Sequence, residues 1–123
     1  MTRRAWIASL YAIPAVLRAE REFDIDGPVE LYIWLTAKPG AEAALEKTFR
    51  ETFYPAVSSR PGFRGAQLVR KPKTADYTVR LSFDTEDQRV AWAKSEIHDR
   101  AWPALAAHCA KVDYAGFAVV HPR

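Results

Sequence analysis

Large aliphatic residues occupy every second position from Val29 to Leu35, and this alternation predicts a β-strand. The same period recurs from Tyr77 to Phe83, and two further strands are predicted at residues 63–70 and 114–120. The intervening positions of the first strand include Tyr32 and Trp34, so both of its faces carry apolar side chains. We therefore expect both faces of the sheet to be covered in the functional form of the protein.

Three other stretches have the spacing of helices. One helix is predicted over residues 41–53, with Pro55 ending or kinking it. A longer helix is predicted to begin at Thr85, because Thr85 and Gln88 have capping-box spacing, and to run to about Ala107 with an interruption at Pro103. The first residues of the chain also predict an amphipathic helix, with its apolar stripe at Trp6, Leu10, Ile13 and Leu17.

The predicted order from residue 29 is strand, helix, strand, strand, helix, strand, which is typical of a ferredoxin-like α+β fold. In that fold a four-stranded antiparallel sheet carries both helices on one face. The other face then needs a partner, and a face-to-face homodimer would supply it. We expect residues 1–28 to form a helical extension and linker, and residues 29–123 to form the ferredoxin-like domain.

The composition narrows the classes of function. A chain of 123 residues favours a single domain, and its net charge of +3 is scattered, so we expect no nucleic-acid partner. The basic run at residues 70–73 has no interleaved aromatic residues and indicates a solvated turn. Cys109 is the only cysteine, and no apolar stretch approaches the length of a membrane span. A cytoplasmic protein without a membrane span is the expectation.

Motifs for common cofactors are missing from the sequence. His98, His108 and His121 do not have zinc-ligand spacing, and the single cysteine cannot form a Cys-x-x-Cys pair. The five glycines form no phosphate loop or dinucleotide fingerprint. We therefore expect no bound metal and no nucleotide or flavin cofactor.

The longer helix carries two aromatic side chains beside a histidine. At the helical repeat, Trp92, Ser95, His98, Asp99 and Trp102 form a stripe next to the apolar one. Such a stripe would line the edge of a cleft between helix and sheet. It is equally typical of tryptophans that belong partly to the core and of a solvated histidine. The spacing alone leaves both interpretations open.

Four segments together resemble the antibiotic biosynthesis monooxygenase family of the dimeric α/β barrel superfamily: VELYIWLTAKPGAEAALEKTF, RPGFRGAQLVR, YTVRLSFDTEDQRVAW and AWAKSEIHDRAW. The resemblance covers roughly residues 29–121. It implies a homodimer that oxidises a small quinol- or anthrone-like aromatic molecule without a cofactor. It further implies that His98 acts as the base and that Trp92 and Trp102 stack on the substrate. Tyr32 and Trp34 would lie on the strand that faces or flanks the cleft, and Ser95 would line its edge.

The same family leaves two other functions open. Some members degrade haem, so a haem-binding protein with His98 as axial ligand is one alternative. Other members have no known activity, and a non-catalytic dimeric binding or interaction module is the second alternative. The sequence contains no asparagine, a residue that members commonly use near the cleft, and this favours the module.

Overall fold

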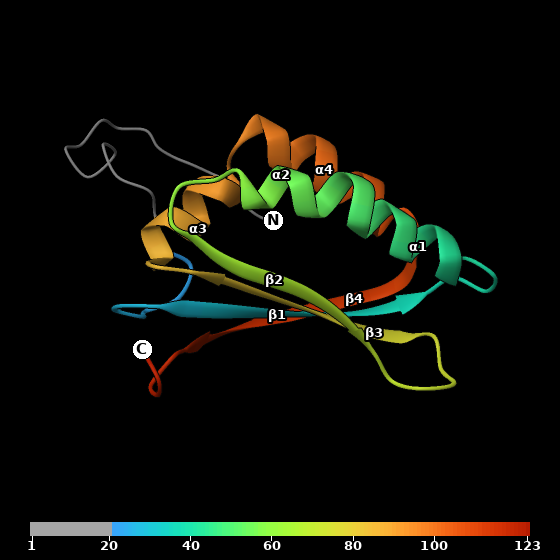
Figure 1. Cartoon of the computed structure of the whole chain (residues 1–123), viewed down its shortest axis with the longest axis horizontal. Helices are drawn as coiled ribbons and strands as arrows, with labels where there is room; N and C mark the ends of the chain where they lie inside the picture. Colours follow the sequence, from blue (N-terminus) through green and yellow to red (C-terminus); the bar gives the residue numbers. More distant parts are fainter. Residues whose placement is uncertain (1–20) are drawn as a thin grey trace.

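A computed structural model describes residues 21–123, and its helices lie together on one side of a sheet (Figure 1). The predicted N-terminal helix lies outside the described residues. In chain order the elements are β1 (Val29–Ala37), α1 (Glu42–Thr48), the π-helix η2 (Phe49–Phe53), α2 (Tyr54–Ser58), β2 (Phe63–Arg70), β3 (Asp76–Phe83), α3 (Glu86–Ala93), α4 (Glu96–Ala106) and β4 (Cys109–Ala118).

The four strands form one antiparallel sheet in the order β2-β3-β1-β4. On the central strand, Ile33 pairs with Val79 on one side and with Tyr114 on the other. This arrangement confirms the predicted ferredoxin-like α+β fold. The face opposite the helices carries no helix of the described part of the chain (Figure 1).

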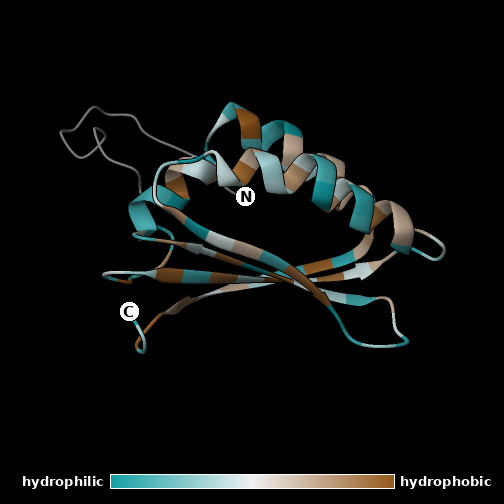
Figure 2. Ribbon diagram, viewed as in Figure 1, coloured by the Kyte–Doolittle hydropathy of each residue, from teal (hydrophilic) through white to brown (hydrophobic). Residues whose placement is uncertain are grey.

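The alternating strands place their aliphatic residues under the helices. Along β1, Val29, Leu31 and Leu35 are buried, whereas Trp34 on the opposite face is exposed. Along β1 in Figure 2, brown residues alternate with teal or paler ones, which is the period that the sequence predicts. The core lies between this face of the sheet and the apolar sides of the helices, with Phe53, Phe83 and Leu105 fully buried.

The first helical region is longer than predicted. It continues through α1, η2 and α2 as far as Ser58, although Pro55 was expected to end or kink it. The stretch from Phe49 to Phe53 is a π-helix, which stands directly before the turn that holds Pro55. Proline cannot donate the backbone hydrogen bond of a regular helix, and the wider π turn absorbs this mismatch.

The second helical region is broken where the prediction had one helix. It divides into α3 and α4 at Lys94 and Ser95, not at Pro103. Ser95 has extended backbone angles, and its hydroxyl accepts a hydrogen bond from the His98 amide at 3.2 Å, so it caps α4. The predicted cap at Thr85 is confirmed, with its hydroxyl accepting from the Gln88 amide at 3.1 Å. Pro103 lies inside α4, and the helix continues past it to Ala106. The Pro103 carbonyl still accepts a helical hydrogen bond from the Ala107 amide at 3.0 Å.

The last strand begins at Cys109, five residues earlier than predicted, and ends at Ala118, two residues earlier than predicted. Its first half is an exposed edge strand, so residues 109–113 lack the alternation that marks a half-buried strand. Within residues 21–123, no helix has the length and apolar character needed to cross a membrane.

Candidate functional site

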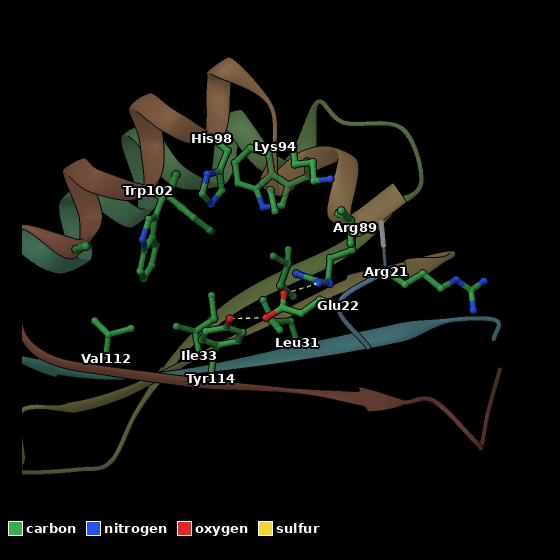
Figure 3. A pocket seen from close by; sticks show the side chains of 16 residues that line it. Arg21, Glu22, Leu31, Ile33, Arg89, Lys94, His98, Trp102, Val112 and Tyr114 are labelled. Atoms are coloured by element: carbon green, nitrogen blue, oxygen red, sulfur yellow. Dashed lines mark hydrogen bonds and ion pairs between the residues drawn. The ribbon is translucent and has the colours of Figure 1, made fainter. Parts of the chain in front are cut away.

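A cavity of about 1150 Å³ lies between the sheet and the helices α3 and α4. Leu31 and Ile33 of β1 and Val112 of β4 form much of its floor, and Trp102 and His98 project toward them from α4 (Figure 3). Most of the lining side chains are apolar, and the polar ones come chiefly from α3, α4 and the chain before β1. The size and the mixture of groups fit a pocket for a small organic ligand.

His98 points into this cavity from the first turn of α4 (Figure 3). The capping bond of Ser95 fixes the His98 backbone, and the break before α4 turns the imidazole toward Trp92. The imidazole meets the indole edge to face, with 5.0 Å between ring centroids and 83° between planes. The side chain keeps 23% of its surface exposed, so it is largely withdrawn from solvent but still reachable through the cavity.

Burial lowers the pKa of His98 below its ordinary value, and the charge of Arg89 lowers it further, while Asp99 opposes both effects. The imidazole is therefore neutral at pH 7 and able to accept a proton. Its Nδ1 atom is buried without a hydrogen-bond partner among the described residues, because the nearest Asp99 oxygen is 3.6 Å away. A neutral histidine that lines a cavity is a candidate general base.

The two tryptophans of the predicted stripe have different surroundings. Trp92 is only 3% exposed and packs edge to face on Phe53, so most of its indole belongs to the core. Trp102 is half-buried and also meets Phe53 edge to face, with 6.4 Å between centroids. Both line the cavity, and Trp102 presents more of its surface to it (Figure 3).

The other predicted site residues lie elsewhere. Ser95 is occupied as the cap of α4, donates to the Trp92 carbonyl at 2.7 Å and does not line the cavity. Tyr32 and Trp34 lie on the opposite face of the sheet, because neighbouring residues of a strand point to opposite faces. The structure thus brings Trp92, His98 and Trp102 together around the cavity. Ser95, Tyr32 and Trp34 lie outside it.

An ion-pair network at one side of the cavity was not predicted from the sequence. Glu86 is fully buried, and Arg89 is 3% exposed. Arg89 donates from Nε to Glu86 Oε1 at 2.7 Å and from Nη2 to Glu86 Oε2 at 2.9 Å. The same Nη2 donates to Glu22 Oε1 at 3.0 Å. Burial alone would lower the pKa of Arg89, but its bonds to the two carboxylates raise it overall, so Arg89 stays charged.

This network also fixes the chain that precedes β1. The backbone amides of Glu22 and Phe23 donate to Glu86 Oε2 at 3.1 and 2.9 Å. The Glu22 carboxylate accepts a hydrogen bond from the Tyr114 hydroxyl of β4, which closes a bridge from α3 to the sheet (Figure 3). The only signal in the sequence is the spacing of Glu86 and Arg89, one turn apart on a helix.

The site combines a neutral base, an apolar interior and a buried cation. Such a site can hold a flat hydrophobic molecule and can remove a proton from it away from bulk water. The described part of the chain has no group of three His, Cys, Asp or Glu side chains that could hold a metal ion. Fold and cavity together define a small ferredoxin-like domain with a cavity large enough for a small organic molecule.

Comparison with known proteins gives the family. The sequence pattern of the family described as "Antibiotic biosynthesis monooxygenase" matches residues 28–104, so the chain belongs to this family. No curated protein sequence matches the chain.

Solved structures share the fold at low sequence identity. SnoaB, a cofactor-independent oxygenase from Streptomyces nogalater, is 19% identical with a TM-score of 0.67, over 80% of this chain and 99% of that chain. A Caulobacter crescentus protein that carries the same family name is 19% identical with a TM-score of 0.69, over 78% and 92%. Rv0793 from Mycobacterium tuberculosis is 14% identical with a TM-score of 0.65, over 76% and 95%.

Proposed function

We propose that the protein is a cofactor-independent oxygenase whose active site is the cavity between α3, α4 and the sheet. Its substrate is a small electron-rich aromatic molecule of the quinol or anthrone type. The observation that carries this proposal is the neutral imidazole of His98, directed into an apolar cavity beside two indoles. Family membership and the shared fold of SnoaB support the same reaction class.

In this proposal His98 removes a proton from the bound substrate. The resulting anion is electron-rich enough to pass an electron to dioxygen directly, so the protein contributes a base, an orientation and a dry environment. For an anthrone, the ring methylene and one O₂ give a ring carbonyl and one water. The substrate supplies both electrons that reduce the second oxygen atom, and the reaction therefore balances without a further reductant.

Trp102 provides the face on which the aromatic substrate stacks. Its half-buried indole lies opposite the aliphatic floor formed by Ile33 and Val112, which leaves a slot with apolar walls. Offset aromatic stacking of this kind contributes roughly 0.5–1.5 kcal/mol beyond the burial of apolar area. Trp92 supports His98 from behind and is a positioning residue in this account.

The working protein is proposed to be a homodimer that pairs through the face of the sheet opposite the helices. Tyr32 packs on Phe117 and Trp34 there, with ring centroids 5.0 and 6.2 Å apart. Trp34 and Phe117 remain 39% and 45% exposed, which makes this aromatic patch suited to burial against a second copy. Light scattering on the wild type and on Trp34→Glu tests this: the variant should have half the mass of the wild type, and equal masses would contradict the pairing.

Oxygen consumption with 1,8-dihydroxyanthrone tests the proposed activity. The wild type should accelerate oxygen uptake and form the anthraquinone, and His98→Gln should lose at least about 100-fold, the lower range for general base catalysis. His121→Gln, which changes an exposed histidine that does not line the cavity, is the matched control. No acceleration by the wild type, or equal rates for wild type and His98→Gln, would overturn the proposal.

The alternatives give different outcomes in simple assays. A haem protein would shift the Soret band of added hemin, and His98→Ala would abolish the shift. A non-catalytic binding module would bind the aromatic molecule without consuming oxygen. The cytoplasmic location that the sequence suggests stays a prediction.

A further inference from the structure

We propose that Arg89 receives a carbonyl oxygen of the bound aromatic molecule and that Glu22, from the chain before the family-matched region, is the positioning residue for Arg89. This inference rests on the proposed function and names the substrate more narrowly, as an aromatic ketone whose carbonyl lies away from His98. The family match begins at residue 28, so Glu22 lies before the matched region.

The Arg89 guanidinium uses two of its three nitrogens in hydrogen bonds within residues 21–123. Nε and Nη2 are both used, on Glu86 and on Glu22. Nη1 donates to no residue in the described part of the chain, although Arg89 lines the cavity and its side chain reaches toward it (Figure 3). A buried guanidinium normally has its donors satisfied, so this amino group is available to a ligand.

Charge balance decides between a neutral and an anionic acceptor at Arg89. Two carboxylates, Glu22 and Glu86, already contact Arg89 within hydrogen-bond distance. The positive charge of Arg89 is therefore compensated, and an anionic group of the ligand would also approach two negative charges. A neutral carbonyl oxygen accepts a hydrogen bond from Nη1 without this repulsion.

The position of Arg89 in the cavity gives it a role in the proposed reaction. Arg89 and His98 line the same cavity, so one small ligand can contact both groups. When a C–H bond of an anthrone breaks, the proton goes to the imidazole and the electron pair is delocalised onto the carbonyl oxygen. The electron pair is shared with the aromatic rings, so the oxygen gains only part of a negative charge, which the Nη1 donor stabilises with less repulsion than a full anionic group would meet. Arg89 thus has a catalytic role and Glu22 a positioning role.

Glu22 is held firmly enough for this role. Its amide donates to Glu86 Oε2, and its carboxylate contacts both Arg89 and the Tyr114 hydroxyl. Phe23 follows it and packs against the Arg89 guanidinium, whose central carbon lies 4.9 Å from the ring centroid. Without the Glu22 carboxylate the guanidinium is held, among the described residues, only by Glu86 and by the Phe23 ring, so Nη1 is less firmly directed.

Binding of two unreactive molecules of the same shape tests the inference without turnover. 9-Fluorenone and fluorene share a tricyclic skeleton and differ by the carbonyl oxygen. In equilibrium dialysis the wild type should bind fluorenone about tenfold more tightly, the effect expected of one charged hydrogen bond. Arg89→Lys keeps the buried charge but has a single nitrogen in place of three, which the two carboxylates engage, and it should bind both molecules equally.

Glu22→Ala should reduce the preference to about threefold or less, and Asp24→Ala, an equal loss of charge two residues away, should keep it. Glu86→Gln/Arg89→Leu removes both buried charges together, which keeps the test open if Arg89→Lys fails to fold. Equal binding of both molecules by the wild type, or an unchanged preference in a folded Arg89 variant, would overturn the inference. Because no oxygen is consumed, this result is independent of whether the protein is an oxygenase.

Discussion

Gly116 is the position where one added methyl group tests how the segment before β1 is attached. A Cβ atom at Gly116 would lie 2.4 Å from Cδ2 and 2.5 Å from Cε2 of Phe23, against 3.4–4 Å for an ordinary contact. The Phe23 ring would therefore have to move by about 1 Å, the difference between 3.4 and 2.4 Å. This movement disturbs the contacts of Phe23 with Tyr114 and Arg89.

The expected cost of Gly116→Ala follows from these contacts. Overpacking of this size costs roughly 1–3 kcal/mol, and the loss of chain entropy in the unfolded state returns roughly 0.4–1 kcal/mol. We expect a net loss of about 1–2 kcal/mol in the free energy of unfolding, measured by urea denaturation. Gly65→Ala is the matched control, since its Cβ would have nothing within 4 Å and it should be neutral or slightly stabilising.

Limited proteolysis gives a second readout of the same variant. Arg21 pairs with Asp26 and Asp87 in the attached segment, so trypsin cleavage after Arg21 should be faster in Gly116→Ala than in Gly65→Ala. Equal unfolding free energies and equal cleavage rates for the two variants would refute the reasoning, because they would mean that residues 21–23 are not held against β4.

Three further predictions concern single side chains. Since the pKa of His98 is lowered, kcat/KM for 1,8-dihydroxyanthrone should be constant at pH 7 and above and should fall only below about 6.5; a midpoint above 7 would contradict the neutral base. Burial and the Glu46 carboxylate raise the pKa of Tyr77 to about 12, so the stability that Tyr77 contributes should be present below pH 10 and lost between pH 10 and 12. In urea denaturation, the difference in unfolding free energy between wild type and Tyr77→Phe should shrink in that window. A constant difference would be inconsistent with this prediction. Ser95→Ala should cost about 1 kcal/mol of unfolding free energy through the lost cap of α4, and Ser95→Asp should restore most of it; equal losses in both variants would argue against capping.

The fold could be predicted because its signals are local and periodic. The alternation from Val29 to Leu35 and the cap at Thr85 are properties of a few consecutive residues, and the element order follows from them. The break at Ser95 was missed because Ser95 also fits a helical stripe, and only the folded backbone shows that it is a cap. Pro55 was misjudged because a π turn does not follow from residue spacing.

The candidate site could be predicted only in part for a related reason. Trp92, His98 and Trp102 lie within three helical turns of one another, so helical spacing alone predicted that they lie close together, and all three line the cavity. The network of Glu22, Glu86 and Arg89 joins positions 67 residues apart, and nothing in their local sequence indicates the contact. Tyr32 and Trp34 show the opposite problem, because period two places them on a face but does not say which face holds the cavity.

The central claim is that His98 removes a proton from an aromatic substrate inside this cavity before oxygen reacts. Rapid mixing of the protein with 1,8-dihydroxyanthrone in the absence of oxygen tests this step alone, since the deprotonated anthrone absorbs at longer wavelength than the neutral form. We predict that the wild type forms the anion and consumes it when oxygen is admitted, whereas His98→Gln does not form it. Formation of the anion at the same rate and extent in His98→Gln would contradict the account.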